Sequence, residues 1–265
     1  MLSHNQTENE YPLISVVTVV FNSEKLIDIT IQSVIEQDYP NIEYIVIDGG
    51  SSDGTIKHLK KNRKKITHLI SESDGGIYDA MNKGIFVARG HWINFLNAGD
   101  CFISKNTISK LVPYIEESSD VIYGSVGIIY SNFCRIQNPG NYKNLWRGMQ
   151  FSHQSAFIKL KYHKKNLFNI NNKIAADLGF FFEAHKKGLI FQEIPQTISA
   201  VINGGISESN RISTILDSCR AVCSGRFCLF LRFYYGFRIL NEILRSTIKN
   251  LLPHNLVIKI ILMKK

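Results

Sequence analysis

The stretch Ile42–Thr55, with the sequence IEYIVIDGGSSDGT, decides the fold that we predict for this chain. Its first half is a short apolar run that ends at Asp48, and its second half is a loop of glycine, serine and Asp53. A short apolar run bounded by glycine is typical of a strand buried in a parallel sheet. Open α/β sheets bind ligands at the carboxyl ends of their strands, so this pattern indicates a ligand site.

Three further strands are predicted on either side of this stretch. Leu13–Val20 precedes it, and His68–Ile70 and Trp92–Leu96 follow it, with segments of helical periodicity between them. Alternating strands and helices imply a parallel sheet with right-handed crossovers, which places the loops after the strands on one edge. Those loops also carry Asp74 and Asp100. We therefore expect several carboxylates around one crevice.

The basic charge of the chain is concentrated in its last part. The 265 residues carry a net charge of +9, and residues 211–265 contain ten Lys and Arg against two acids. From Phe230 to Leu251 apolar residues recur every three or four positions, which predicts one amphipathic helix. We therefore predict a domain over residues 1–210 and a basic amphipathic helical tail over residues 211–265. The nearly neutral domain argues against a nucleic-acid partner.

The tail has two interpretations. Its helix packs on its own domain, or it lies in an anionic membrane surface with its aromatic side in the lipid. The sequence favours the membrane because the apolar stripe and the positive excess coincide. No uncharged run reaches the roughly 18 residues that a spanning helix needs. The polar N-terminal start and the five cysteines without a CxxC pair then predict a cytoplasmic protein, peripheral on the inner face of the plasma membrane.

Several sequence blocks together resemble family 2 of the glycosyltransferases, and within it the branch that assembles bacterial O-antigen and colanic acid. The blocks are IDGGSSDGT, SESDGGIYDAMNKGI, NAGD, HQS, AAD and GGIS, in this order between Leu13 and Ser207. The resemblance implies a GT-A fold, an α/β fold whose Rossmann-like, mostly parallel central sheet is flanked by helices. It also implies a nucleotide-diphosphate sugar donor, by default UDP-linked, a divalent cation (Mg²⁺ or Mn²⁺) and inversion at the anomeric carbon.

The resemblance further implies roles for individual residues. Asp48 would contact the base or ribose, with Thr18 and Asn22 in the same pocket. Asp100 would bind the metal, as the last acid of the family's Asp-x-Asp motif. The other residues expected at the donor site are Asp53, Asp74, Lys83, Asn97, His153 and Gln154.

Three positions depart from the family's pattern. Asn97 and Gly99 stand where acids could occur, which leaves one clear carboxylate for the metal. Mg²⁺ and Mn²⁺ accept such a site when donor phosphates and water complete the coordination. Gly49 stands where many relatives carry another Asp.

Inverting transfer requires one general base, because a diphosphate leaves readily once a cation neutralises its charge. Glycosidases, by contrast, use paired carboxylates. Asp177 in the AAD block is the expected base, with Glu183 as second choice. Both Asp177 and Asp53 have an alternative interpretation, because aspartate is also common as the N-cap of a helix.

Two other classes of function are open from the sequence. Gly50–Gly54 fits G-x-S-x-G, the nucleophile elbow of α/β-hydrolases, with Ser52 as nucleophile. The hydrolase interpretation lacks an oxyanion-hole motif and leaves the acids after the strands unexplained. The chain could also be a non-catalytic module that binds nucleotide sugars. We expect a transferase that moves a hexose or N-acetylhexosamine to a polyprenyl-diphosphate-linked oligosaccharide in surface polysaccharide biosynthesis.

Overall fold

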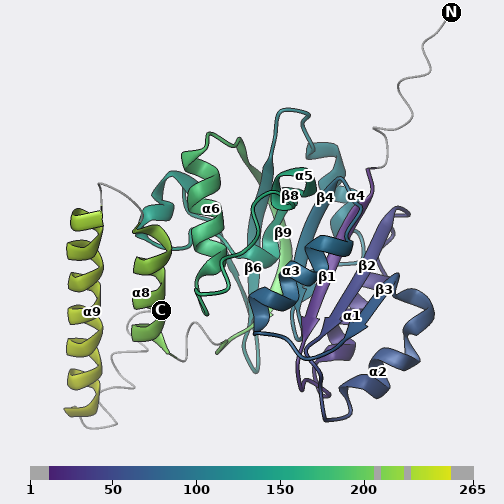
Figure 1. The fold of residues 1–265 in the computed structure, drawn as a ribbon, viewed down its shortest axis with the longest axis horizontal. Helices are drawn as coiled ribbons and strands as arrows, with labels where there is room; N and C mark the ends of the chain where they lie inside the picture. The colour runs from purple at the N-terminus through teal and green to yellow at the C-terminus, as the bar shows by residue number, and fades with distance from the viewer. Residues whose placement is uncertain (1–11, 206–209, 224–227, 252–265) are drawn as a thin grey trace, which may run out of the picture.

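A nine-stranded sheet forms the centre of the described part of the protein (Figure 1). The structure is a computed structural model that describes residues 12–205, 210–223 and 228–251. The strands are β1 (Ile14–Val20), β2 (Ile42–Asp48), β3 (His68–Ser71), β4 (Trp92–Asn97), β5 (Cys101–Phe102), β6 (Val121–Ile129), β7 (Cys134–Gln137), β8 (Ala156–Lys159) and β9 (Phe191–Ile202). The α-helices are α1 (Ile27–Ile35), α2 (Thr55–Lys61), α3 (Ile77–Val87), α4 (Thr107–Leu111), α5 (Leu160–His163), α6 (Ala176–Lys186), α8 (Arg211–Val222) and α9 (Cys228–Leu251). Short 3₁₀ helices are η1 (Arg63–Lys65), η2 (Val112–Tyr114), η3 (Tyr142–Arg147) and η4 (His153–Ser155).

The strands follow the order β3-β2-β1-β4-β8-β6-β9-β5, with β7 beside β6. Strands β1 to β4 are parallel to one another, as the alternation of strands and helices predicts. Beyond β4 the sheet is mixed, because β8 runs antiparallel to both β4 and β6, whereas β9 is parallel to β6. The α/β fold with a parallel sheet region and flanking helices is therefore confirmed.

Strand β1 is buried on both faces because helices cover both sides of the sheet (Figure 1). Val17 and Val19 belong to the apolar cluster on the side of α3 and α6, whereas Val16 and Val20 belong to the cluster on the side of α1. Successive side chains of a strand point to opposite faces, which produces this alternation. A strand covered on both faces has no polar side, so its sequence is an unbroken β-branched run.

Two strands differ from their predicted extents. The sequence predicts two strands within residues 120–130, but β6 runs without a break from Val121 to Ile129. The sequence also predicts a strand over Leu189–Glu193, but β9 continues to Ile202. Pro195 lies in β9 beside the point at which pairing with β6 shifts register. Proline cannot donate a ladder hydrogen bond, and the irregular pairing accommodates it where the sequence pattern suggests an end.

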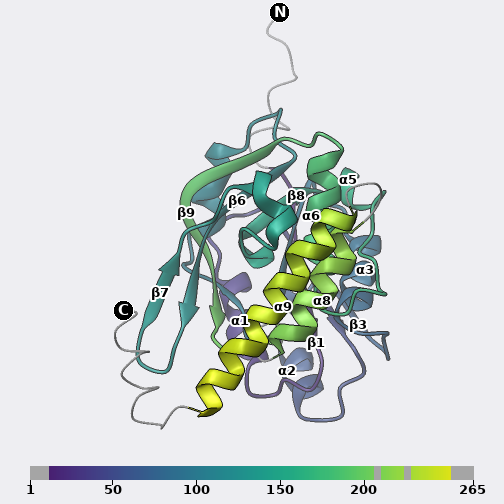
Figure 2. The same cartoon turned by 90° about the vertical axis from the view of Figure 1, so that its left-hand side faces the viewer.

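Helices α8 and α9 pack onto the sheet domain. Helix α8 lies between α6 and α9 (Figures 1 and 2). Ile215 and Val222 of α8, together with Leu231 and Tyr235 of α9, belong to the same apolar cluster as one face of the sheet. The core thus continues past residue 210, where the sequence predicts a domain boundary; the division into two domains stays a prediction.

Helix α9 is the amphipathic helix predicted in the tail, and it uses its two faces differently. One face packs on η3, where the hydroxyl of Tyr235 donates to the carbonyl of Trp146 and the guanidinium of Arg238 donates to the carbonyl of Arg147. The other face is open, and Phe233 is 72% exposed. The side chains of Ile248 to Leu251 and the second apolar-basic segment, residues 255–265, lie outside the described part.

Membrane-spanning helices are not found in the described residues: none of the helices there combines the length and the apolar content that crossing a bilayer requires.

The contact between α3 and β1 gives a first testable prediction. A Cβ added at Gly84 would lie 2.5 Å from Cγ1 of Val17, in the middle of the core. Overpacking costs about 1–3 kcal/mol, whereas alanine gains about 1 kcal/mol over glycine in a helix, so Gly84→Ala is expected to lower the free energy of unfolding in urea. Gly236 of α9 has no atom within 4 Å of an added Cβ. Gly236→Ala is the matched control and is expected to stabilise; a Gly84→Ala protein that is equally stabilised would contradict the packing.

Candidate active site

The candidate site lies at the carboxyl edge of the parallel strands. In the register of the sheet Val20 is paired with Asp48, Asp48 with Ser71, and Val19 with Asn97. The ends of β1, β2, β3 and β4 therefore lie side by side, and the loops that follow them meet at one edge. This arrangement confirms the edge that the sequence predicts from its alternating strands and helices.

Asp48 is fully buried at the end of β2, and its carboxylate holds the neighbouring loops. It accepts hydrogen bonds from the backbone N–H groups of Gly50 and Ser51 and from the hydroxyls of Ser51 and Ser71. The hydroxyl of Ser51 in turn accepts from the backbone N–H of Asn22. Asp48 thus fixes the loops after β1, β2 and β3 together, and its contact with a base or ribose stays a prediction.

Thr18 is placed differently from the expectation that it lines the donor pocket. Its side chain is fully buried on the α1 side of β1, where its hydroxyl accepts from Tyr44 at 3.2 Å. Burial raises the pKa of Tyr44, so this hydroxyl keeps its proton and remains a donor. Thr18 therefore has no exposed surface with which to touch a ligand in this conformation.

Asn22 and Ser52 bear on the hydrolase alternative. Asn22 has a left-handed backbone with φ of 45°, and its Oδ1 accepts from the backbone N–H of Ser52 at 2.8 Å. The hydroxyl of Ser52 is 3.5 Å from the same oxygen and is exposed. A nucleophilic serine requires a hydrogen bond to a base such as histidine. The contact of Ser52 within the described chain is with an amide instead, which does not activate it.

Asp53 braces the start of α2, the structural role that the sequence left open. Its carboxylate accepts from the backbone N–H groups of Thr55, at 2.9 Å, and Glu24, at 3.1 Å. The pKa of Asp53 is lowered chiefly by the side-chain hydrogen bond from Thr55. Asp53 lies in the loop beside Asn22, and its contact with a donor stays a prediction.

Asp74 lies directly against the end of β2. Its Oδ1 accepts from the backbone N–H of Gly76 at 2.8 Å. A Cβ added at Gly49 would sit 2.5 Å from its Oδ2, so the absence of a side chain at residue 49 is what lets Asp74 occupy this place. Lys83 holds the same loop through an ion pair of 2.8 Å with Glu72, which is the main cause of its raised pKa.

The short helix η4 connects two acids that are distant in the sequence. His153 Nδ1 lies 3.0 Å from Oδ2 of Asp177, at the start of α6. The next residue, Gln154, donates from Nε2 to Oδ2 of Asp100 at 2.8 Å. Successive residues of a 3₁₀ helix point about a third of a turn apart, so neighbouring side chains can hold groups on different sides. Expected site residues from three separate sequence blocks are therefore brought together.

Two further groups complete this network. Asn97 Nδ2, which can only donate, lies 3.5 Å from Nε2 of His153. When the ring of His153 is neutral and accepts this hydrogen bond at Nε2, its proton is on Nδ1 and faces Asp177. The hydroxyl of Tyr78 in α3 lies 3.0 Å from Oδ1 of Asp177. In the described part of the chain, Oδ1 of Asn97 is buried without a hydrogen-bond partner, which leaves an acceptor for a ligand or water.

The two acids have opposite electrostatic environments. Burial raises the pKa of Asp100 from its ordinary value of 3.8 to about 6, although the bond from Gln154 and the charge of His153 oppose this. Burial alone would also raise the pKa of Asp177, but His153, Leu178 and Tyr78 together hold it below its ordinary value. Asp177 is therefore an ionised acceptor, whereas the charge of Asp100 is poorly stabilised by the protein itself. Opposite shifts of this kind are typical of sites in which two carboxyl groups have different roles.

The fit of a divalent cation can be judged from Asp100. Across the ranges that the structure describes, no three His, Cys, Asp or Glu side chains gather closely enough to hold a metal ion. Asp100 uses Oδ2 for its bonds to Gln154 and to the backbone N–H of Asn97, which leaves Oδ1 for another ligand. A poorly stabilised carboxylate with one free oxygen suits Mg²⁺ or Mn²⁺ that takes its other ligands from donor phosphates and water.

The sequence did not indicate the roles of Tyr78 and Ser71. Tyr78 looks like an ordinary helix residue in the block SESDGGIYDAMNKGI, although its hydroxyl contacts Asp177. Ser71 looks like a strand end, although it donates to Asp48. Both depend on contacts across the sheet edge, for which local sequence carries no signal.

The raised pKa of Asp100 predicts a pH dependence of stability. The folded protein binds this proton more tightly than the unfolded chain, so the stability that protonated Asp100 contributes is present below about pH 4 and is lost as the pH rises through about 6. Asp100→Asn cannot ionise. Its free energy of unfolding relative to the parent protein is expected to rise between those limits by up to about 3 kcal/mol, measured by urea unfolding with EDTA.

Asp38 is exposed and provides the matched control for this measurement. Asp38→Asn is expected to show no such change between acid and neutral pH. A constant difference between Asp100→Asn and the parent protein across the range would show that Asp100 is not destabilised by burial.

The sequence and the fold are similar to those of known proteins. Residues 15–189 match the sequence profile of Glycosyl transferase family 2. A PGL/p-HBAD biosynthesis glycosyltransferase of Mycobacterium tuberculosis is 26% identical over 219 residues, which cover 78% of this chain and 81% of the relative. An uncharacterized glycosyltransferase of the same organism is 32% identical over 180 residues, which cover 65% of this chain and 69% of that protein.

Two solved structures share the fold. TarS of S. aureus, residues 1–349 in complex with UDP, has a TM-score of 0.65 at 18% identity, covering 92% of this chain and 76% of that chain. The mannosyltransferase PcManGT of Pyrobaculum calidifontis, in complex with GDP-Man and Mn²⁺, has a TM-score of 0.62 at 16% identity, covering 85% and 70%. These likenesses confirm the GT-A-like fold. With the family profile matched over most of the chain, the protein belongs to Glycosyl transferase family 2 and is a glycosyltransferase.

Proposed function

We propose that this glycosyltransferase moves a hexose or N-acetylhexosamine, with inversion, from a nucleotide-diphosphate sugar to a polyprenyl-diphosphate-linked oligosaccharide in the synthesis of an O-antigen or similar surface polysaccharide. The observation that carries the proposal is the pair of Asp100 and Asp177, which His153 and Gln154 hold at the carboxyl edge of the parallel strands. Structural neighbours bound to UDP and GDP-Man support a nucleotide-diphosphate donor. UDP is the favoured nucleotide because it is common in the family that the sequence resembles.

Asp177 is the proposed general base. As the acceptor hydroxyl oxygen attacks the anomeric carbon, Asp177 takes its proton, the bond from that carbon to the diphosphate oxygen breaks, and the nucleotide diphosphate leaves. A carboxylate has about four acceptor positions, and Asp177 uses three of them, for His153, Tyr78 and the backbone N–H of Leu178. One position is left for the acceptor hydroxyl. Attack from the side opposite the leaving group inverts the configuration.

The remaining residues are proposed to hold the donor. A bound Mg²⁺ or Mn²⁺ would neutralise the diphosphate, and Asp100 is the carboxylate placed to hold it. The amide of Asn97 and the ring of His153 lie between the two acids, within reach of phosphate or sugar oxygens. The other residues proposed for donor contact are Asn22, Asp53 and Asp74, in the loops that Asp48 fixes, and Lys83 in α3.

Donor binding and the base can be tested in one series. We expect one sugar of a panel of UDP-glucose, UDP-galactose, UDP-GlcNAc and GDP-mannose to raise the melting temperature in the presence of Mn²⁺, because a ligand that binds only the native state stabilises it. With that donor, Asp177→Asn is expected to keep the thermal shift but to lose about 10²–10⁴-fold in turnover. The turnover is measured as release of the nucleotide diphosphate.

Ser52→Ala separates the alternatives in the same assay. A transferase should keep its turnover to within about threefold, whereas a hydrolase that used Ser52 would lose nearly all of it. An Asp177→Asn protein with unchanged turnover would remove Asp177 as the base. A parent protein that binds the donor but releases no nucleotide diphosphate would favour the non-catalytic binding module.

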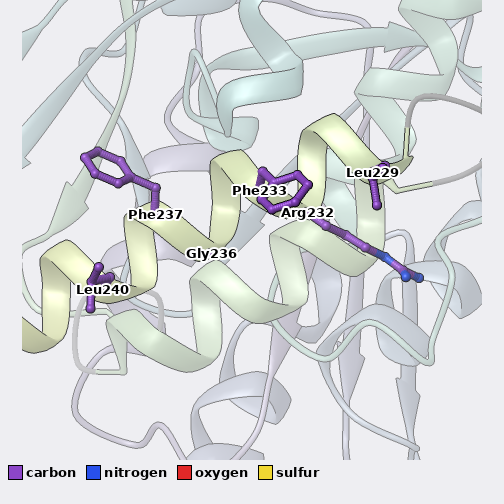
Figure 3. Close-up of a pocket in the computed structure, with 6 residues that line it drawn as sticks. All are labelled: Leu229, Arg232, Phe233, Gly236, Phe237 and Leu240. Carbon is purple, nitrogen blue, oxygen red and sulfur yellow. The ribbon is translucent and has the colours of Figure 1, made fainter.

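We also propose that α9 brings the enzyme to its lipid-linked acceptor on an anionic membrane, at the cytoplasmic face of the plasma membrane. Its open face carries a shallow apolar depression around Gly236 (Figure 3), which is lined by Leu229, Arg232, Phe233, Gly236, Phe237 and Leu240. Arg232 at the border of this face complements anionic head groups while the rings enter the lipid. On the opposite face of α9, Arg238 donates to η3, and Glu242 pairs with Arg211 of α8.

The membrane proposal is tested by replacing rings on α9 and on another helix. Phe233→Ser/Phe237→Ser is expected to reduce co-flotation with liposomes containing phosphatidylglycerol by at least about tenfold, because each ring loses roughly 1.5–3 kcal/mol of burial. Phe86→Ser is the matched control, since Phe86 of α3 is 66% exposed and lies away from α9. Equal flotation of the double variant and the parent protein would refute the assignment.

A further inference from the structure

Asp217 in α8 is a buried acid outside the residues discussed so far. Its side chain is only 6% exposed, although it lies in the basic part of the chain beyond residue 210. Its Oδ2 accepts two backbone hydrogen bonds, from Ile174 at 2.8 Å and from Ala175 at 3.0 Å. Its other oxygen lies 3.9 Å from Arg220, whose side chain is 73% exposed, so that ion pair is weak. The two N–H groups are therefore the main compensation for the buried charge.

These two N–H groups belong to the turn that presents Asp177. Ala175 is the N-cap residue of α6 and supplies no side-chain cap, and Asp177 lies in the first turn of that helix. A helix begins with N–H groups that lack partners within the helix, and a carboxylate is the favoured partner there. Asp217 of α8 binds the N–H groups of Ile174 and Ala175, the two residues that lead into α6.

The same turn also positions Tyr78. The carbonyl of Ile174 lies 2.8 Å from the hydroxyl of Tyr78, which is also 3.0 Å from Oδ1 of Asp177. One hydroxyl proton thus faces two acceptors, and the position of Ile174 determines how the proton is shared. Asp217, Ile174, Tyr78 and Asp177 therefore form one continuous chain of contacts from α8 into the candidate site.

We propose that Asp217 is a positioning residue for the transfer reaction: it holds residues 174–175 so that Asp177 keeps its bonds to His153 and Tyr78. The inference rests on the proposed role of Asp177 as base. It makes α8 part of the catalytic unit, because a helix of the predicted tail fixes the start of the helix that carries the base.

The experiment measures the ionisation of Asp177 directly. The full-length protein is labelled with ¹³C at aspartate carboxyl groups, and the Asp177 signal is assigned by its absence in Asp177→Asn. The groups that face this carboxylate are His153 from η4, Tyr78 from α3 and the backbone of Leu178. In Asp217→Ala these contacts loosen while burial persists, so Asp177 is expected to titrate at a higher pH than in the parent protein.

Catalysis provides the second readout, with UDP-GlcNAc hydrolysis as the probe reaction. Small displacements of a reacting group cost up to about 100-fold, so Asp217→Ala is expected to lower kcat by about 10–100-fold with little change in KM. Asp217→Asn keeps an oxygen that can accept both N–H bonds and is expected to stay within about threefold of the parent protein. Arg220→Ala, which removes only the exposed partner, is expected to behave like the parent protein.

Ile215→Ala controls for a general loss of packing, because Ile215 is buried in the same helix but bonds to nothing in the turn. It is expected to lower the melting temperature without moving the titration of Asp177. Unchanged titration of Asp177 in Asp217→Ala, or an Asp217→Asn protein as impaired as Asp217→Ala, would overturn the positioning role. If Asp217→Ala does not fold, the kcat values of Asp217→Asn and Ile215→Ala decide whether the proposal holds. A kcat that falls in Asp217→Asn but not in Ile215→Ala would contradict the proposal. An active Asp177→Asn protein would instead refute the base while leaving the titration result valid.

Discussion

The candidate site depends on two adjacent side chains, His153 and Gln154, that point to different acids. Asp100 comes from the turn after β4 and Asp177 from α6, and β6, β7 and β8 lie between them in the chain. Among the elements that the structure describes, η4 is the one that hydrogen-bonds to both acids. Because a short 3₁₀ turn fixes the directions of consecutive side chains, one dipeptide sets the distance between Asp100 and Asp177. After β6 and β7 the chain comes back to the candidate site at η4.

The opposite environments of the two acids follow from these partners. Gln154 is neutral and gives Asp100 one hydrogen bond, which does not offset the cost of burial. Asp177 receives an imidazole, a phenol and a backbone N–H, which together stabilise its charge. One acid is thus left in need of a counter-charge, and the other is held ionised. This division suits the roles that we propose for Asp100 and Asp177.

The tail of the chain is divided between structure and surface. Helix α8 completes the core and contacts the turn before α6. Helix α9, which lies in front of α8 in Figure 2, covers η3 with one face and leaves its aromatic side chains exposed on the other. The two interpretations of the tail, a helix packed on its domain and a helix with an open apolar side, thus describe opposite faces of the same helix. The hydrogen bonds of Tyr235 and Arg238 to η3 hold that aromatic face in a fixed direction.

The sequence predicted the elements whose pattern is local and missed those that depend on distant contacts. Strands β1, β2 and β4 were recognisable because burial on both faces imposes largely apolar runs. The loops after β2, β3 and β4 were recognisable because glycine and aspartate cluster there. The length of β9 could not be recognised from the sequence, because Pro195 looks like the end of a strand. The pairing with β6 shows that the strand continues past it. Thr18 was expected at the surface of a pocket, but the side of the sheet to which a strand residue points depends on helices elsewhere in the chain. The bonds of Asp177 to His153 and Tyr78 likewise join segments that no local pattern connects.

The contact between Gly49 and Asp74 has a consequence for variation at this site. The carboxylate of Asp74 fills the volume in which a side chain at residue 49 would stand. An acid at position 49 would bring a second negative charge into the same space, so both carboxylates cannot occupy the place that Asp74 takes here. An aspartate at position 49 would require residue 74 to be shorter or to turn away, so substitutions at these two positions are expected to be correlated across the family.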